Sequence, residues 1–268
     1  MWMPRWGMLR GMGSYVDVAG LNTYYETHGQ GDPVLLLHGG LVGAESWGAQ
    51  IPALAEHYQV VVPERRGHGH TPDIEGRLTD RMMAQDTIEF MDAVGLTSAH
   101  FVGWSDGAMV AALVALERPD LVEKLVLIGQ YLNPEGQRPE LAKALDNPDT
   151  AYEAFAEVAR PAYEAASPDG PEHFPVFFGK VIRMWREDQG IPLADLSGLT
   201  SPTLLLQGDD DVVKVEHNVA VAAALPEAQL AVIPGASHAV PIEKPGLVNT
   251  LLLEFLGSEH PAKLMPLS

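Results

Sequence analysis

A single serine lies between two glycines in residues 103–107, which read Gly-Trp-Ser-Asp-Gly. The short segment 99–102 before it is typical of a buried strand, and the alanine-rich segment 108–113 after it predicts a buried helix. A chain that turns this sharply from strand to helix crowds its backbone, and small residues two positions either side relieve the crowding. Ser105 would then sit on a strained bend with its Oγ exposed. The alternative is a glycine-rich turn whose serine has no function.

A serine hydroxyl becomes a nucleophile when a neighbouring base removes its proton, and that base is usually a histidine held by a carboxylate. In parallel sheets such groups gather beyond the C-terminal ends of the strands. His238 ends the small-residue loop 234–238, which directly follows the predicted strand 229–233, and it comes after the serine in the chain. We therefore predict that His238 is the base. The alternative is an ordinary histidine of a surface loop.

Three consecutive aspartates, Asp209, Asp210 and Asp211, follow the predicted strand 203–207. Because like charges repel, burial of more than one of them is unfavourable. Asp211 precedes two valines and is best placed to turn inward and orient the histidine. Asp209 and Asp210 are expected to be solvated. The chain order Ser, Asp, His is the order found in hydrolases whose nucleophile sits on a strand-to-helix turn.

His68 and His70 are the one pair of nearby histidines whose spacing could suggest a metal site. The sequence has no cysteine, and no third ligand lies close to the pair. Because zinc sites in proteins need at least three protein ligands, we expect a structural loop here, with no metal and no cofactor.

Alternating strand and helix signals predict an α/β protein with a mostly parallel, doubly wound sheet of about eight strands. Residues 130–199 break this alternation and predict a helical insertion that forms a cap. We therefore divide the chain into a disordered leader (1–13), a core (14–129 and 200–256), the cap (130–199) and a tail (257–268). The strands are expected at 14–18, 21–27, 34–37, 58–63, 99–102, 125–128, 203–207 and 229–233, and core helices at 46–58, 79–94, 108–118, 216–225 and 244–256.

The composition limits the possible partners. The 268 residues carry a formal net charge of −19, which disfavours binding to nucleic acid or to an anionic membrane. No apolar run reaches the roughly 18 to 20 residues that span a bilayer, and the N-terminus lacks a secretion signal. We expect a cytoplasmic protein that acts on a small molecule, and a homo-oligomer is possible.

The assembled motifs resemble those of the α/β-hydrolase superfamily of serine hydrolases, over about residues 16–256. They are His-Gly-Gly at 38–40, Arg-Gly-His-Gly-His-Thr at 66–71, the serine pentad, Gly-Asp-Asp-Asp at 208–211 and Gly-Ala-Ser-His at 235–238. The pentad is similar to that of the esterase-like biphenyl-hydrolase-like proteins. The resemblance implies that Ser105 is the nucleophile, Asp211 the acid and His238 the base. It also implies that the oxyanion is stabilised by backbone N–H groups of Asp106 and Gly40, with Leu41 as the substitute for Gly40.

The function expected from these residues is hydrolysis of small carboxylic esters or lactones through an acyl-enzyme. The same triad could instead serve perhydrolysis, haloperoxidase-type chemistry or C–C bond hydrolysis, or a ligand-binding receptor with little turnover. The Asp106 carboxylate could recognise a substrate ammonium group. Alternatively, it caps the helix that it begins or satisfies a buried hydrogen-bond donor. Candidate pocket residues are Leu41, Trp104, Phe174, Phe178 and Trp185. The alternative for the four aromatic residues is that they pack in the core of the protein or of the cap.

Overall fold

A computed structural model describes residues 12–257 and contains an eight-stranded sheet with the strand order β1-β2-β4-β3-β5-β6-β7-β8. Strand β2 is antiparallel to both of its neighbours, and the other adjacent strands from β4 to β8 run parallel. The predicted mostly parallel sheet of about eight strands is therefore confirmed. The strands are β1 Met12–Val18, β2 Leu21–His28, β3 Pro33–Leu37, β4 Gln59–Pro63, β5 Ala99–Trp104, β6 Val122–Ile128, β7 Thr203–Asp210 and β8 Ala228–Ser237.

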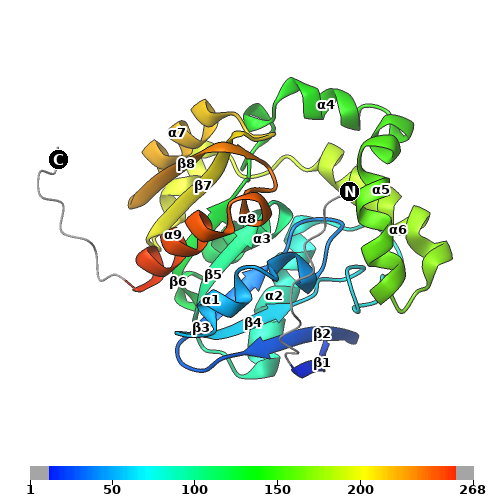
Figure 1. The fold of residues 1–268 in the computed structure, drawn as a ribbon, viewed down its shortest axis with the longest axis horizontal. Helices are drawn as coiled ribbons and strands as arrows, with labels where there is room; N and C mark the ends of the chain where they lie inside the picture. Colours follow the sequence, from blue (N-terminus) through cyan, green and yellow to red (C-terminus); the bar gives the residue numbers. More distant parts are fainter. Residues whose placement is uncertain (1–11, 258–268) are drawn as a thin grey trace, which may run out of the picture.

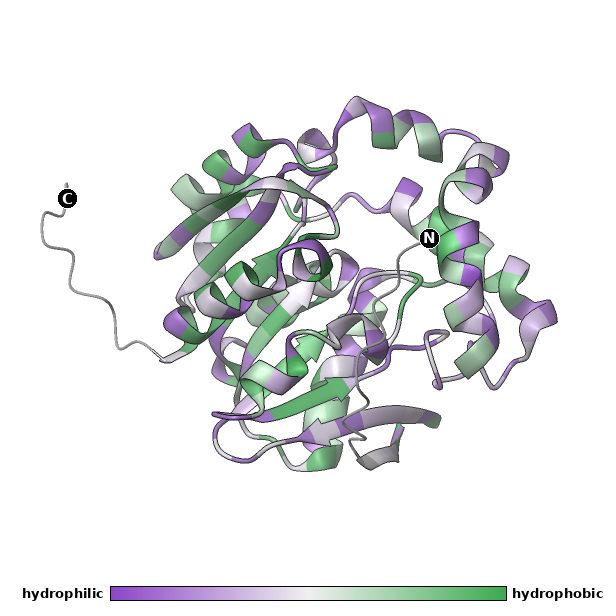
Figure 2. Cartoon of the chain, viewed as in Figure 1, coloured by the Kyte–Doolittle hydropathy of each residue, from purple (hydrophilic) through white to green (hydrophobic). Residues whose placement is uncertain are grey.

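Helices cover both faces of the sheet because the central strands are apolar on both sides. In β3, Leu35 and Leu37 face the cluster that holds α2, α3 and α7, while Val34 and Leu36 face α1, α8 and α9. Figure 2 shows these central strands as mostly hydrophobic. The helices of the core are α1 Ile51–Leu54, α2 Asp80–Val94, α3 Asp106–Glu117, α7 Val215–Ala224, α8 Val240–Glu243 and α9 Pro245–Gly257.

Local capping signals predict the ends of α2 correctly, but the helix expected before it, over 46–58, is not formed as predicted. Thr79 Oγ1 accepts a hydrogen bond from the Met82 N–H at 3.1 Å, and Gly95 ends the helix in the left-handed region. The single helix expected over 46–58 is wrong. The chain forms a short 3-10 helix, Ala44–Trp47, and then α1, because Gly48 separates the two turns and Pro52 fits only at the start of a helix.

The segment between β6 and β7 carries three helices that lie together beside the sheet (Figure 1). They are α4 Pro139–Leu145, α5 Pro148–Ala166 and α6 Phe174–Glu187. Aromatic rings hold α5 to α6, with Tyr163 stacked on Phe177 at 5.1 Å between ring centroids. Hydrogen bonds fasten this segment to the loop after β4, where Asp73 lies 2.8 Å from His173 Nε2 and forms an ion pair with Lys180 at 2.6 Å.

Two of the sequence expectations concern the chain ends. The expected leader falls outside the described residues except for Met12 and Gly13, which belong to β1. The expected tail also lies outside them, apart from Gly257 at the end of α9. Between residues 12 and 257, the structure contains no helix with the length and apolarity to cross a membrane.

The loop that follows β4 holds a buried histidine whose protonation opposes folding. The His68 ring packs on His38 and on Phe177 of the insertion, and its Nδ1 lies 3.0 Å from the Arg66 carbonyl oxygen. Burial, together with the charge of Arg65, lowers the pKa of His68 to about 3. His70 instead pairs with Glu64 at 2.9 Å, and no group of possible metal ligands occurs within residues 12–257.

We predict that His68→Gln makes the protein less sensitive to acid. The unfolded chain binds a proton at His68 below pH ~6.5, whereas the folded chain does not until about pH 3. Folding stability is therefore lost as the pH falls between these values, by up to about 1.4 kcal/mol per pH unit. Urea unfolding at pH 7, 6, 5 and 4 should show a shallower fall for the variant. His57→Gln, at an exposed position, is the control, and equal slopes for all three proteins would contradict the prediction.

Candidate active site

Ser105 lies on the turn between β5 and α3. Its backbone has φ 54° and ψ −123°, a conformation that residues other than glycine rarely adopt. The flanking glycines make this turn possible. A Cβ atom on Gly103 would lie 2.3 Å from the Gly107 carbonyl oxygen, and one on Gly107 would lie 2.0 Å from the Leu37 carbonyl oxygen. The crowding inferred from the sequence is therefore present at both positions. It explains why residues 103 and 107 of the pentad are glycines.

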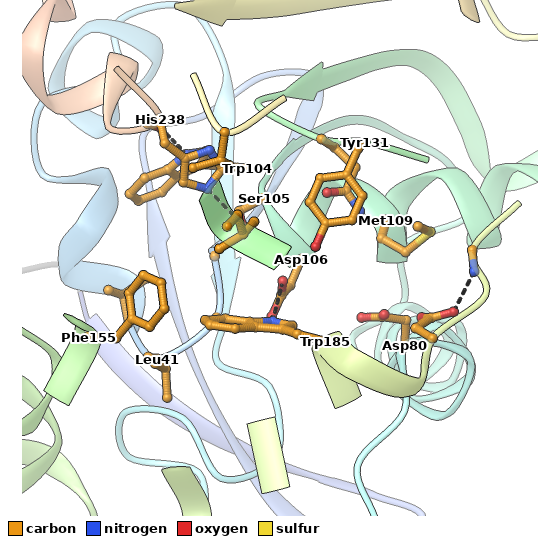
Figure 3. A pocket seen from close by; sticks show the side chains of 18 of the residues that line it. Leu41, Asp80, Trp104, Ser105, Asp106, Met109, Tyr131, Phe155, Trp185 and His238 are labelled. Carbon is orange, nitrogen blue, oxygen red and sulfur yellow. Dashed lines mark hydrogen bonds between the residues drawn. The ribbon is translucent and has the colours of Figure 1, made fainter. Parts of the chain in front are cut away.

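The structure brings Ser105, His238 and Asp211 together in one hydrogen-bonded chain. His238 Nε2 lies 3.0 Å from Ser105 Oγ (Figure 3). His238 Nδ1 lies 2.8 Å from Asp211 Oδ1. The Asp211 side chain is fully buried, while 30% of the His238 side chain is exposed. The three residues lie beyond the C-terminal ends of β5, β7 and β8, where the parallel sheet places functional groups.

The three aspartates at the end of β7 are separated as the sequence suggests, with Asp209 and Asp210 in the strand and Asp211 directly after it. Asp211 turns inward, and its Oδ1 also accepts the Val213 N–H at 3.3 Å. Asp209 and Asp210 are exposed, with Asp210 lying 3.7 Å from the Arg138 guanidinium. Sequence reasoning missed the buried Gln207, whose amide donates to the Gly208 and Val213 carbonyls and fixes the loop after β7.

Gly129, directly after β6, is a second residue that sequence reasoning missed. It has a φ of +59°, and a Cβ atom there would lie 3.1 Å from His238 Nδ1 and 3.2 Å from Asp211 Oδ2. The absence of a side chain therefore leaves room for the histidine and the carboxylate to meet. A glycine directly after an apolar strand was the available signal, but only the fold shows what packs against it.

The loop after β3 lies against the serine turn, as an oxyanion-binding loop must. A Cβ atom on Gly39 would lie 3.4 Å from Ser105 Cβ, and one on Gly40 would lie 2.3 Å from Asp106 Oδ2. Leu41 has a φ of 63°, so the backbone is strained where the loop turns. The buried Arg65 guanidinium holds the loop by donating to the His38 and Gly39 carbonyl oxygens. As the first residue of α3, Asp106 has an N–H with no partner inside its own helix.

A cavity of about 200 Å³ opens beside Ser105 and His238, between the sheet and the insertion. Of the predicted pocket residues, Leu41, Trp104 and Trp185 line it. Trp104 is also nearly buried, and its indole N–H donates to the His238 carbonyl at 2.9 Å. Residues that sequence reasoning missed include Tyr131, Asp80, Met109, Phe155 and Asp188.

The prediction that Phe174 and Phe178 line the pocket is wrong, because neither residue lines this cavity. Both are buried inside the insertion, where Phe174 packs against Tyr163 and Phe178 against Tyr152. Helical spacing shows which side chains share a face of α6 but not what that face contacts. The alternative interpretation, that these rings pack in the interior of the insertion, agrees with the structure.

The Asp106 side chain already has a partner. Both of its oxygens accept the Trp185 indole N–H, at 2.9 and 2.8 Å (Figure 3). Burial raises the pKa of the Asp106 carboxyl, and this effect is opposed by the Arg65 charge and by the Trp185 hydrogen bond. Asp106 therefore fixes α6 of the insertion over the serine turn.

The fold and the sequence together define the class of this protein. Residues 34–251 match the profile of the alpha/beta hydrolase family, and the chain belongs to that family. The resemblance expected from the motifs is thereby confirmed, and so is the α/β-hydrolase fold. The family and the relatives identify the protein as a hydrolase.

Particular relatives span nearly the whole chain. The proposed carbamate hydrolase RutD of Agrobacterium fabrum is 30% identical over 87% of this chain and 97% of its own length. Among solved structures, the meta-cleavage product hydrolase CumD of Pseudomonas fluorescens is 27% identical with a TM-score of 0.76, covering 91% of this chain and 97% of that one. An enzyme that degrades N-acyl homoserine lactones is 25% identical with a TM-score of 0.73, covering 90% and 100%.

Proposed function

We propose that this protein is a serine hydrolase that cleaves small carboxylic esters or lactones through a covalent acyl-enzyme. The observation that carries the proposal is the hydrogen-bonded chain from Ser105 through His238 to Asp211, placed on a strained turn at the wall of a cavity. The lactone-degrading relative supports the substrate class. The cavity volume of about 200 Å³ favours small substrates.

In this proposal, Ser105 Oγ attacks the carbonyl carbon while its proton passes to His238 Nε2. Asp211 holds the Nδ1–H and stabilises the imidazolium that forms. The N–H groups of Gly40 and Asp106 donate to the oxyanion, and the loss of one such donor typically costs about 2.7 to 4 kcal/mol of the barrier. His238 then gives its proton to the leaving alcohol. Water, activated by the same histidine, releases the acid and restores the serine.

Turnover of p-nitrophenyl acetate and butyrate tests this proposal. We expect sustained steady-state release of p-nitrophenol over many turnovers. One stoichiometric burst without a steady state would contradict the proposal and favour a ligand-binding receptor. A panel of esters, lactones and amides, compared by kcat/KM, then identifies the preferred class.

A second candidate is the hydrolysis of carbamates, which the relationship to RutD favours. A carbamate presents the same kind of carbonyl to Ser105, so the same triad would serve. An aryl N-methylcarbamate compared with the aryl acetate of the same leaving group separates the two candidates. A higher kcat/KM on the carbamate would replace the ester proposal.

A further inference from the structure

The cavity beside Ser105 is unevenly charged. Three carboxyl side chains line it, those of Asp80, Asp106 and Asp188, and none of the described residues that line it is lysine or arginine. Leu41 and Phe155 lie together on another part of the wall, whereas Asp80 lies beyond Asp106 and Met109, away from His238 (Figure 3). The cavity therefore has an apolar part and an acidic part, both within reach of a ligand held at Ser105.

Asp80 is an unusual residue to find in such a wall. Only 6% of it is exposed, and its Oδ1 has no hydrogen-bond partner among the described residues. It is the first residue of α2, where a negative charge is favourable, but that position does not require burial against a cavity. A buried acceptor without a donor carries a free-energy cost that a ligand with N–H groups could remove.

Asp188 faces Asp80 from the end of α6. Its Oδ1 accepts the Gly190 N–H at 2.7 Å. Burial and a hydrogen bond with Asp188 hold the pKa of Asp80 well above its usual range. A bound cation would favour the ionised form of the Asp80 carboxyl.

The basic groups around the pair do not line the cavity. Arg65 is buried and donates to the His38 and Gly39 carbonyl oxygens, and its charge lowers the pKa of Asp80 against the larger, opposite effect of burial. A second hollow, which Asp80 and Asp188 also line, carries Arg77, Arg81, Lys180 and Arg183. Arg77 pairs with Glu187 and Lys180 pairs with Asp73, while Arg81 and Arg183 are exposed and water screens their charges. Asp106 is occupied by Trp185, which leaves Asp80 and Asp188 as the carboxyls able to receive a ligand.

We propose that Asp80 and Asp188 form a binding site for the cationic end of the substrate, a protonated amine or a similar small organic cation. Such a group supplies both the charge and the N–H donors that the pair lacks, in a setting largely removed from water. The proposal names the substrate class of the proposed hydrolysis. Binding of a cation by the pair does not depend on the proposed function, but the statement that this cation is part of a substrate rests on it. It also predicts that carboxylate-bearing compounds bind poorly.

Binding of three six-carbon probes tests the site without any turnover. Hexylammonium, 1-hexanol and hexanoate are titrated by calorimetry into a Ser105→Ala background. We expect hexylammonium to bind about tenfold more tightly than hexanol, the value of one good charge-assisted hydrogen bond, and hexanoate to bind most weakly. Equal affinities for the ammonium and the alcohol would overturn the proposal.

Substitutions then locate the site. Asp80→Asn and Asp188→Asn should each remove most of the preference for the cation while leaving hexanol affinity within about twofold, since one charge-assisted bond is lost. Asp210→Asn, which removes an exposed carboxylate outside the cavity, is the matched control and should keep the full preference. Asp80 is the first residue of α2, so Asp80→Asn could prevent folding. Asp188 follows α6 and is not part of α2, so Asp188→Asn provides the test if Asp80→Asn does not fold. Loss of the preference in Asp106→Asn alone would overturn the assignment to the pair.

A matched ester pair connects the site to catalysis. In the enzyme with Ser105 intact, 6-aminohexyl acetate should show a higher kcat/KM than heptyl acetate, and Asp80→Asn should remove the difference. If neither ester is cleaved but hexylammonium still binds selectively, the proposed ester hydrolysis fails and the cation site stands. If both are cleaved equally by wild type and variant, the hydrolysis stands and the cation site fails.

Discussion

Ser105→Ala is expected to reduce ester turnover by about 10⁴-fold or more, because the variant loses the only atom that attacks the carbonyl. Its thermal midpoint should stay close to that of the wild type. Alanine keeps the Cβ atom of serine, so the strain of the positive φ at this turn is unchanged. The measurement is initial-rate kinetics with p-nitrophenyl butyrate, beside thermal unfolding followed by circular dichroism.

A control variant distinguishes the loss of the nucleophile from the effect of replacing any serine by alanine. Ser98→Ala removes a hydroxyl that donates to the exposed Glu123 carboxylate at 2.6 Å, at the opposite end of β5 from Ser105. It should retain nearly full turnover. Turnover by Ser105→Ala within tenfold of the wild type would remove Ser105 from the mechanism.

Asp211→Asn should lower kcat by about 10⁴-fold, since the amide no longer fixes the tautomer in which His238 can accept the serine proton. The carboxylate is buried and accepts hydrogen bonds from His238 Nδ1 and from the Val213 backbone, so the substitution keeps the shape of the loop. The measurement is kcat with p-nitrophenyl acetate, with thermal unfolding followed by circular dichroism as a check on folding.

The neighbouring aspartates, which are the last two residues of β7, supply matched controls. Asp209→Asn and Asp210→Asn alter exposed side chains and should change kcat by less than about threefold, as surface substitutions usually do. A severe effect of Asp210→Asn with a mild effect of Asp211→Asn would show that another carboxylate orients the histidine in solution.

Much of the site could be predicted because its signals are local. The glycines at 103 and 107 and the valines after Asp211 each reflect steric or hydrophobic demands of their own segment. The sheet followed from short apolar strands that alternate with helices. Thr79 and Gly95 located α2 for the same reason, since caps act within one helical turn.

The remaining features depend on segments distant in the chain. Gly129 matters only because His238 and Asp211 meet beside it, and Asp80 gains its role only when α6 brings Asp188 next to it. The short turns of 44–54 replaced an expected helix because glycine and proline outweighed its apolar spacing. Periodicity likewise failed to show which aromatic residues of the insertion reach the cavity.

Labelling with a fluorophosphonate probe tests the nucleophile assignment most directly. The probe forms a covalent bond only with a serine that a neighbouring base has activated, so it reports on the triad without any assumption about the natural substrate. Digestion and mass spectrometry of the labelled protein should find one adduct, on Ser105, and none in Ser105→Ala. An adduct on a different residue, or equal labelling of the two proteins, would contradict the account.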